Sequence, residues 1–145
     1  TSRLNRLMRE FEIENFSGLM HQIKSRRNPK LHEQIVDAMT TNETLWFRDT
    51  YPFEVLKHEL LPNFSTLKAK QLRIWSAASS SGQEAYSISM TIQEYLASKP
   101  GALSNNIQIV GTDISATMLR DASEAMNDRD AYDDANRKLE SLKTF

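Results

Sequence analysis

Apolar side chains recur at intervals of three and four residues through the first sixty positions of the chain. This spacing places them on one face of a helix, and it repeats in four successive runs. We therefore expect residues 1–62 to be all-helical. The residues expected to face inward are Leu4, Leu7, Met8 and Phe11 in the first run, Phe16, Leu19, Met20 and Ile23 in the second, Leu31, Ile35 and Ala38 in the third, and Phe53, Leu56 and Leu60 in the fourth.

Polar residues and prolines mark the ends of these helices. Asn15 is a candidate N-cap for the second helix, and Pro52 suits the first turn of the fourth. The polar cluster at 40–44 predicts a turn, and the polar stretch at 62–70 predicts a linker. A domain boundary in that linker would divide the chain into an all-helical N-terminal domain, 1–64, and a second domain, 65–145.

The spacing of apolar positions changes after the linker. We expect a short buried strand at 72–75, a helix at 84–96, a strand at 107–110 and a further helix capped by Ser115. The face of the helix at 84–96 is formed by Ile88, Ile92, Tyr95 and Leu96. This alternation predicts an α/β fold with an all-α N-terminal subdomain and the start of a doubly wound parallel sheet.

The predicted sheet has few strands. Residues 126–145 hold no strand candidate, only Tyr132, Ala135, Leu139 and Leu142 at loose helical spacing. Because two parallel strands make a poor independent sheet, we expect the chain to be truncated or to receive strands from a partner chain. Helical periodicity that begins at the fourth residue also suggests missing sequence upstream. An unpaired sheet edge favours dimerisation.

Composition narrows the classes of function. Hydrophobic residues make up 39% and charged residues 26% of the chain, as in an ordinary globular protein. The absence of cysteine excludes disulfides, thiol catalysis and cysteine-based zinc sites. His21, His32 and His58 lack the spacing of metal ligands, so we expect no metal. A net charge of -1 argues against nucleic-acid binding through bulk charge.

No apolar run approaches the ~20 residues of a membrane span, so we expect a cytoplasmic protein without membrane insertion.

The first predicted strand leads through a loop of small residues, 76–82, into a helix. Backbone amides at such a helix start, followed by an acid after the next strand, outline half of a nucleotide-type site. Asp113 either grips ribose hydroxyls or caps the helix that begins near Ser115. Glu84 either recognises a cationic group of a ligand or compensates the helix dipole. The loop lacks the G-x-G-x-x-G fingerprint, which argues against a nicotinamide or flavin cofactor, and a tight turn without a ligand is the alternative.

The segment 42–49 combines an amide, a hydroxyl, aromatic rings and a guanidinium. Arg48 suits a carboxylate ligand, because its planar donors match the two oxygens. The alternative is that the aromatic residues belong to the core and that Arg48 pairs with Asp49 or Glu43.

On the first helix, Arg3, Arg6 and Arg9 fall on the side opposite the apolar face. They form either a partner-binding basic stripe or an ordinary solvated helix face.

These segments closely resemble the chemotaxis receptor methyltransferases of the CheR type. The resemblance rests on five blocks in order, namely Thr41-Asn42-Glu43-Thr44-Leu45-Trp46-Phe47-Arg48-Asp49, Pro52-Phe53, Leu61-Pro62, Arg73-Ile74-Trp75-Ser76-Ala77-Ala78-Ser79-Ser80-Ser81-Gly82-Gln83-Glu84-Ala85-Tyr86-Ser87 and Gly111-Thr112-Asp113-Ile114-Ser115. It covers about residues 2–125, and the tail at 126–145 aligns with nothing in the family pattern. Enzymes of this family transfer a methyl group from S-adenosylmethionine to glutamate side chains of bacterial chemoreceptors. They have a small helical domain on a Rossmann-like methyltransferase domain.

The resemblance implies S-adenosylmethionine as cofactor, S-adenosylhomocysteine as product, no metal, and the cytoplasmic domain of chemoreceptors as partner. It implies that Asn42, Thr44 and Arg48 reach the cofactor and the target carboxylate, with Arg48 as the candidate catalytic residue, that Glu84 binds the methionine end, that Asp113 binds the ribose, and that Arg3, Arg6 and Arg9 contact the receptor. Because the family's later strands have no counterpart here, we expect the isolated chain to catalyse poorly. The alternative functions are a non-catalytic receptor-docking module that uses the basic N-terminal helix, and a small regulatory ligand sensor.

Overall fold

The computed structural model describes residues 2–125 and residue 137. The elements follow in the order α1 (Ser2–Glu10), α2 (Phe16–Ser25), α3 (Pro29–Met39), α4 (Tyr51–Val55), η1 (Leu56–Leu60), α5 (Leu61–Thr66), β1 (Leu72–Ala77), α6 (Gln83–Ser98), β2 (Ile107–Thr112) and α7 (Ala116–Ala125). The helical residues predicted at 126–145 lie outside the described part of the chain, apart from residue 137.

The first three helices form a small lobe with its own hydrophobic cluster. Met8, Leu19 and Leu31 meet at its centre, one from each helix. Asn15 caps α2 by accepting a hydrogen bond from the Gly18 amide at 2.9 Å, as predicted. Phe16 and Met20 were expected inside but are exposed. The face of α2 that packs in the lobe is therefore centred on Leu19, with Ile23 partly buried beside it.

The helical stretch after Thr50 contains a π turn that changes which leucine points inward. Pro52 lies in the first turn of α4, and Phe53 and Leu56 are buried, as predicted. Leu60 was also expected inside but is 44% exposed, whereas Leu61 is fully buried. η1 is a π-helix, which inserts an extra residue into the turn and rotates the later residues onward. α5 also occupies most of the segment predicted as a linker.

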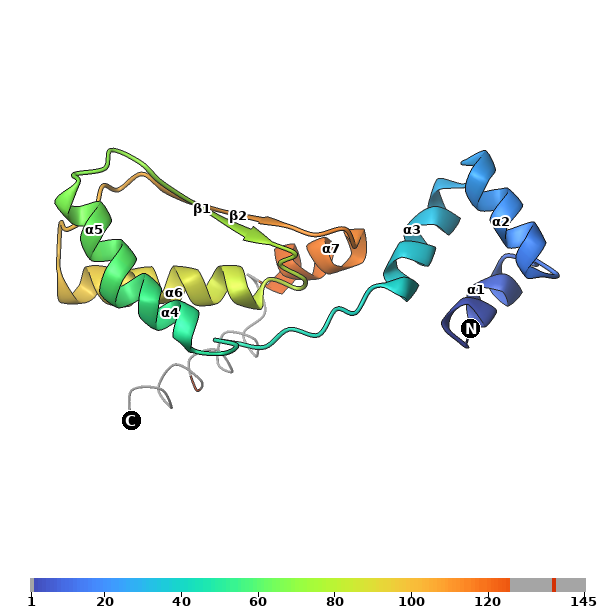
Figure 1. The fold of residues 1–145 in the computed structure, drawn as a ribbon, viewed down its shortest axis with the longest axis horizontal. Coiled ribbons are helices and arrows are strands. Elements are labelled where there is room, and N and C mark those ends of the chain that lie inside the picture. Colours follow the sequence, from blue (N-terminus) through green and yellow to red (C-terminus); the bar gives the residue numbers. More distant parts are fainter. Residues whose placement is uncertain (1, 126–136, 138–145) are drawn as a thin grey trace.

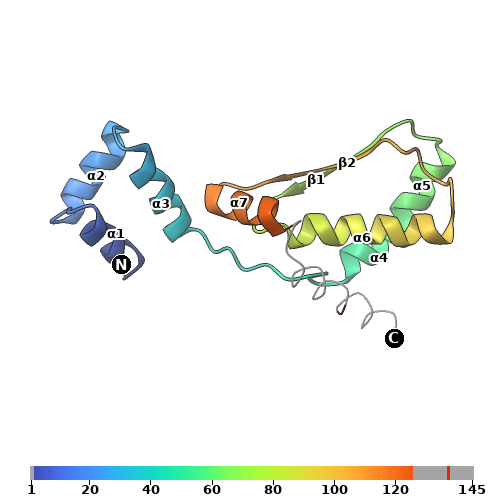
Figure 2. The ribbon, with the colours of Figure 1, turned by 180° about the vertical axis from the view of Figure 1, so that it is seen from behind.

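β1 and β2 pair in parallel, with Leu72 opposite Ile107 and Ala77 opposite Thr112. Both strands run two residues beyond their predicted ends, and α6 connects them. Ile88, Ile92 and Tyr95 on α6 are buried, as the periodicity indicated. β1 was predicted to be buried throughout, yet its burial alternates and Trp75 is 70% exposed. The reason is visible in Figures 1 and 2: the described helices around the sheet lie on one side of the strands.

An extended segment at 41–45 joins the α1–α3 lobe to the rest of the molecule (Figure 1). Beyond it, one hydrophobic cluster unites α4, η1 and α5 with β1 and α6, through residues that include Phe47, Phe53, Leu61, Leu72 and Ile92. The helices at 51–66 thus pack in the same core as the sheet. The division into domains at 1–64 and 65–145 stays a prediction; the clusters divide the described residues at the extended segment instead.

Within residues 2–125 and at residue 137, the helices are all too short or too polar to cross a bilayer.

Candidate functional site

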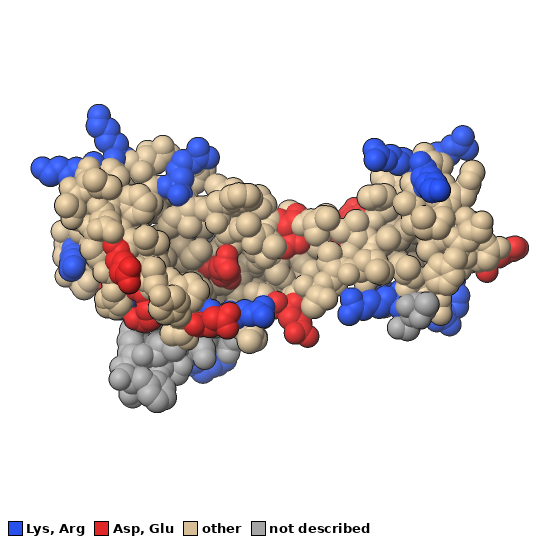
Figure 3. Space-filling view, viewed as in Figure 1, with Lys and Arg blue, Asp and Glu red and all other residues tan. Residues whose placement is uncertain are grey.

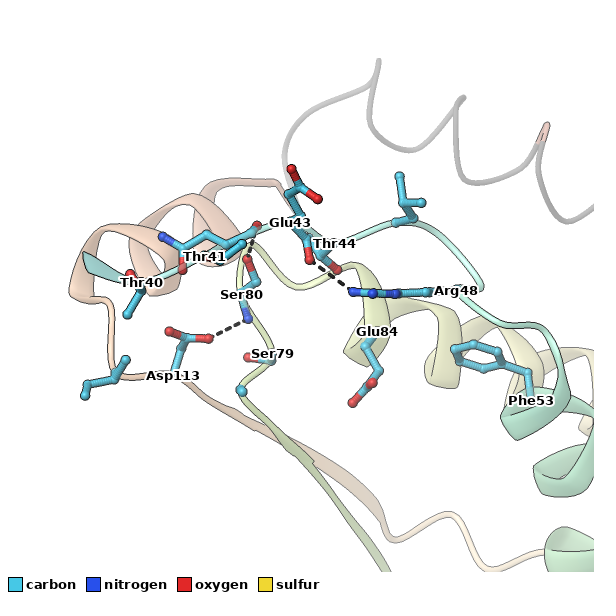
Figure 4. A pocket seen from close by; sticks show the side chains of 14 residues that line it. Thr40, Thr41, Glu43, Thr44, Arg48, Phe53, Ser79, Ser80, Glu84 and Asp113 are labelled. Carbon is cyan, nitrogen blue, oxygen red and sulfur yellow. Dashed lines mark hydrogen bonds between the residues drawn. The ribbon is translucent and has the colours of Figure 1, made fainter. Parts of the chain in front are cut away.

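The carboxyl ends of β1 and β2 open onto a hollow of about 240 Å³. Three segments line it: 40–45 with Arg48 and Phe53, the loop 78–80 with Glu84 from α6, and Asp113 with Ile114 after β2. The five residues expected at a cofactor therefore share one hollow, to which Asn42, Thr44, Arg48, Glu84 and Asp113 all contribute (Figure 4). Ligands of parallel sheets bind at this edge.

The loop between β1 and α6 is held in an unusual backbone conformation. Ala78, Ser80 and Gly82 have positive φ angles of 58°, 49° and 94°. At Gly82 a Cβ atom would lie 2.8 Å from the ring of Tyr86, so this position requires glycine for space as well as for conformation. The tight turn brings the loop backbone close to the hollow, as the small residues of this stretch indicated.

Asp113 uses both carboxylate oxygens to fix the loops around it. Oδ2 accepts a hydrogen bond from the Ser80 amide at 2.8 Å, and Oδ1 accepts one from the Ser115 amide at 2.9 Å. A carboxylate offers about four lone-pair sites, so acceptor capacity remains on the side of the hollow. The helix cap itself is Ser115, whose Oγ accepts from the Met118 amide at 3.1 Å, as predicted.

Glu84 lies in the first turn of α6, on the other side of the Ser79–Ser80 loop from Asp113 (Figure 4). Its Oε1 accepts a hydrogen bond from the buried Ser76 hydroxyl at 2.7 Å. This bond orients the carboxylate, while the residue stays exposed at the hollow. The two acids thus stand apart, with the loop backbone between them.

The segment 42–48 has features of both interpretations, an aromatic residue in the core and an exposed arginine at the hollow. Phe47 is buried, and its amide donates to Ser87 Oγ at 3.0 Å, so this aromatic residue anchors the segment in the core. Arg48 is 63% exposed; Nη1 donates to the Glu43 carbonyl at 3.3 Å, and Nε lies 3.9 Å from an Asp49 oxygen. An exposed pair of this kind is weak, which leaves the guanidinium available to an anionic ligand.

The basic stripe lies on α1 and does not line the hollow. Arg3, Arg6 and Arg9 are exposed, and Figure 3 shows Lys and Arg gathered on the α1–α3 lobe. Arg3 Nη1 donates to the carbonyls of Ala38 and Thr40, at 3.5 and 3.3 Å. Arg9 Nε donates to the Asn5 carbonyl at 3.3 Å. The structure therefore groups five of the predicted site residues and separates these three from them.

The serines of the loop after β1 shape the hollow. Ser80 Oγ donates to the Asn42 carbonyl at 2.9 Å and so ties the extended segment to the β1–α6 loop. Ser76, Ser79 and Ser80 are all buried. A buried hydroxyl needs partners, and Ser76 and Ser80 find theirs in the Glu84 carboxylate and the Asn42 carbonyl. The described residues hold no cluster of potential metal ligands.

Comparison with known proteins identifies the family of this chain. Residues 42–141 match the family model described as CheR methyltransferase, SAM binding domain. The expectation that the resemblance ends near residue 125 was wrong, since the match continues to 141. Asn42, Thr44, Arg48, Glu84 and Asp113 all lie in the matched range.

Individual relatives cover most of this chain. It is 55% identical over 120 residues to Chemotaxis protein methyltransferase Cher2 of Pseudomonas putida, which is 82% of this chain and 44% of that protein. Chemotaxis protein methyltransferase 1 of Pseudomonas aeruginosa is 54% identical over 120 residues, or 82% of this chain and 43% of its own length. Chemotaxis protein methyltransferase of Escherichia coli is 29% identical over 121 residues, 83% of this chain and 39% of its own length. The chain thus spans less than half the length of these relatives. It belongs to the CheR methyltransferase family.

Proposed function

We propose that this chain forms the cofactor-binding part of an S-adenosylmethionine-dependent methyltransferase that esterifies glutamate side chains of chemoreceptors. The observation that carries the proposal is the convergence of five residues from three separate segments on one hollow at the carboxyl ends of β1 and β2. Family membership supports the same cofactor.

The side chains of the hollow fit the chemistry of this cofactor. S-adenosylmethionine carries ribose hydroxyls at one place and an ammonium at another, and both favour a carboxylate partner. Asp113 would accept from the ribose hydroxyls and Glu84 would bind the ammonium, with the Ser79–Ser80 loop between them. Asn42 and Thr44 add an amide and a hydroxyl from the opposite wall. When bound, the cofactor supplies a methyl group on a positively charged sulfur.

The reaction requires the protein to align the carboxylate with the methyl group and to keep water out of the site. A glutamate side chain has a pKa of ~4.3 in model peptides, so it is ionised at neutral pH and requires no general base. Its oxygen forms a bond to the methyl carbon while the carbon–sulfur bond breaks and the electron pair stays on sulfur; no proton moves. Arg48 would orient the incoming carboxylate, and the walls of the hollow would exclude water.

The ribose assignment is tested by titrating the chain with S-adenosylhomocysteine and with its 2′-deoxy analogue, using wild type and Asp113→Ala. Hydrogen bonds to a charged group contribute about 1.5–3 kcal/mol, so the wild type should prefer the ribose form about tenfold or more. Asp113→Ala should lose that preference.

The two-ligand design separates binding from folding. Asp113 also holds the Ser80 and Ser115 amides, so its removal weakens the loops in any case. A general loss of structure weakens both ligands equally and leaves their ratio unchanged. If Asp113→Ala kept the wild-type ratio, the ribose assignment would be wrong.

The activity itself is tested with the full-length protein and receptor fragments. Methyl groups should appear as base-labile carboxyl esters, and Arg48→Ala should slow their formation about tenfold or more at saturating cofactor, if a charge-assisted contact aligns the acceptor. Transfer to any other side chain would contradict the proposed substrate.

Receptor binding through Arg3, Arg6 and Arg9 belongs to the same proposal. Arg6 and Arg9 reach solvent from α1, whereas Arg3 also contacts the end of α3. Changing Arg6 and Arg9 to alanine should weaken receptor binding, and the same change at Lys24 on α2 serves as the control. Equal binding by both variants would remove the stripe from the interface. The cytoplasmic location expected from the sequence stays a prediction.

A further inference from the structure

A carboxylate outside the hollow joins the α1–α3 lobe to the start of α7. Asp37 lies in the last turn of α3, and its two oxygens accept hydrogen bonds from two residues nearly eighty positions away. Ser115 Oγ donates to Oδ1 at 2.6 Å, and Thr117 Oγ1 donates to Oδ2 at 2.7 Å. We refer to these three residues as the Asp37 latch.

The electrostatics of the two helices favour Asp37 in this contact and disfavour it elsewhere. A negative charge in the last turn of α3 is unfavourable, because the carbonyl end of a helix already carries partial negative charge. The same charge lies at the amide end of α7, where it is favourable. Docking of α3 on α7 therefore offsets a cost that Asp37 has within its own helix.

Both hydroxyls of the latch are committed to it. Ser115 is fully buried; its Oγ donates to Asp37 and accepts from the Met118 amide that it caps. Thr117 Oγ1 donates to Asp37 and accepts from Arg120 Nη2 at 2.9 Å, while Arg120 Nη1 contacts Glu33 of α3 at 3.2 Å. The contact is a small hydrogen-bonded network that links the lobe to α7.

The latch closes a circuit of hydrogen bonds around one wall of the hollow. From Asp37 the chain continues through Thr40 to Asn42, whose carbonyl accepts from Ser80 Oγ. The Ser80 amide donates to Asp113, Asp113 accepts from the Ser115 amide, and the Ser115 hydroxyl donates to Asp37, which closes the circuit. The stretch 37–42, which leads into the 40–45 wall, is thus fixed at both of its ends, at Asp37 by the latch and at Asn42 by Ser80.

We propose that Asp37 is a positioning residue for cofactor binding: it holds the α1–α3 lobe against α7, and so holds the 40–45 wall of the hollow in place. The inference rests on the proposed function, since it concerns affinity for S-adenosylmethionine and its product. Asp37 does not line the hollow, so it acts through the segment that follows it.

The test compares variants of the full-length protein in calorimetric titration with S-adenosylhomocysteine. Asp37→Ala removes both acceptors, and its Kd should rise about tenfold, as expected if only a tenth of the molecules keep the wall in place. Asp37→Asn should recover most of the affinity, because an amide can accept from one hydroxyl and donate to the other. Asp121→Ala on α7 is the matched control, for which no change is expected.

A distance measurement reports the lobe directly. The sequence has no cysteine, so cysteines introduced at the exposed Gln22 and Gln93 can be spin-labelled alone. Wild type and Asp37→Asn should give one narrow distance distribution between α2 and α6, and Asp37→Ala a broad one. Thr117→Val, which removes one latch bond from the other side, should broaden it too and provides the test if Asp37→Ala does not fold.

The outcomes separate this inference from the proposed function. If wild type does not bind S-adenosylhomocysteine, the proposed function fails. If wild type binds and Asp37→Ala binds within about twofold of it, with an unchanged distance distribution, the positioning role is overturned. Equal loss in Asp37→Ala and Asp37→Asn would overturn it as well, because the amide keeps the hydrogen bonds.

Discussion

Asp113 and Glu84, two of the acidic residues that line the hollow, are held by different contacts, and this difference makes their proposed roles separable. Asp113 is fixed by two backbone amides, whereas Glu84 is oriented by one hydroxyl, that of Ser76. A substitution at Glu84 therefore disturbs the surrounding loops less than one at Asp113.

Glu84→Gln should weaken binding of S-adenosylhomocysteine about three- to tenfold, less than a buried charge-assisted contact would give, because Glu84 is exposed. The glutamine oxygen can still accept from Ser76, so the loop keeps its shape. Binding of 5′-methylthioadenosine, which has no ammonium, should stay within about twofold. The measurement is calorimetric titration with both ligands, and equal losses for the two would contradict the assignment of Glu84 to the ammonium.

Tyr86 provides a pH-dependent contribution to stability. Its hydroxyl donates to the Ala122 carbonyl, and burial raises its pKa above the usual value of 10.0. The folded protein therefore holds this proton more tightly than the unfolded chain. As pH rises past about 10 the unfolded chain loses the proton first, so this part of the free energy of unfolding falls until the folded pKa is passed.

Tyr86→Phe removes that contribution. The free energy of unfolding should be lower than in wild type by about 1 kcal/mol at pH 8, because a hydrogen bond is lost. The difference between the two proteins should shrink above pH 10. Urea unfolding at both pH values measures it, and a difference that stays constant would exclude the titration of Tyr86 as its cause.

At the residue scale, the sequence predicted the acidic residues at the hollow but not the residue that holds a neighbouring segment in place. Asp113 and Glu84 follow predicted strands or open a predicted helix, so their position at the sheet edge follows from topology. Asp37 has no such local signal. It sits in the last turn of a helix, and its partners are 78 and 80 residues away along the chain. A role that depends on tertiary contacts alone cannot be read from a single sequence.

At the scale of elements, regular periodicity predicted the helices and strands, and irregular geometry limited what it could say. Asn15 and Ser115 were predicted as caps because side-chain chemistry at helix ends is local. The π turn of η1 is not encoded by spacing, so Leu60 was predicted inside in place of Leu61. Trp75 was predicted to be buried but is exposed. Whether a sheet face is covered depends on other elements, and the spacing within one strand does not show that.

The π turn makes a matched pair of variants available. Leu61→Ala should lower the free energy of unfolding by about 2–5 kcal/mol, since it leaves a cavity in the main hydrophobic cluster. Leu60→Ala, at a residue that is 44% exposed, should cost less than about 1 kcal/mol. Urea unfolding compares them, and similar losses for the two would place η1 in ordinary α-helical phase.

At the scale of the whole molecule, the described residues form two hydrophobic clusters that share no member. The Asp37 latch and the ion pair between Arg120 and Glu33, at 3.2 Å, join the α1–α3 lobe to α7 through polar groups. Unfolding of the α1–α3 lobe should therefore leave the part of the molecule that contains β1, β2 and α6 largely folded.

Leu31→Ala tests this separation, because Leu31 is buried at the centre of the lobe cluster. Amides of α2 and α3 should lose protection in native-state hydrogen exchange, whereas those of α6 should keep theirs. Leu67→Ala, at a residue that is 75% exposed, should change neither set. Loss of protection in α2 and α6 together would mean that the chain unfolds as one unit.

The unpaired edges of the two-stranded sheet lead to a prediction about oligomeric state. β1 and β2 pair only with each other among the described residues, so each strand has an unpaired side. Dimerisation through such an edge, expected from the sequence, stays a prediction that sedimentation of the purified protein would test.

The polar character of the contact between α3 and α7 has a consequence for protein engineering. A hydrophobic interface requires many side chains to match in shape. The contact between α3 and α7 consists mainly of a carboxylate that faces two hydroxyls and an arginine that faces an acid. The first forty residues can therefore be exchanged as a cassette between homologues that keep these groups. If the lobe binds the receptor as proposed, chimaeras cut within the extended segment should take their receptor preference from the parent of the lobe and their cofactor site mainly from the other parent.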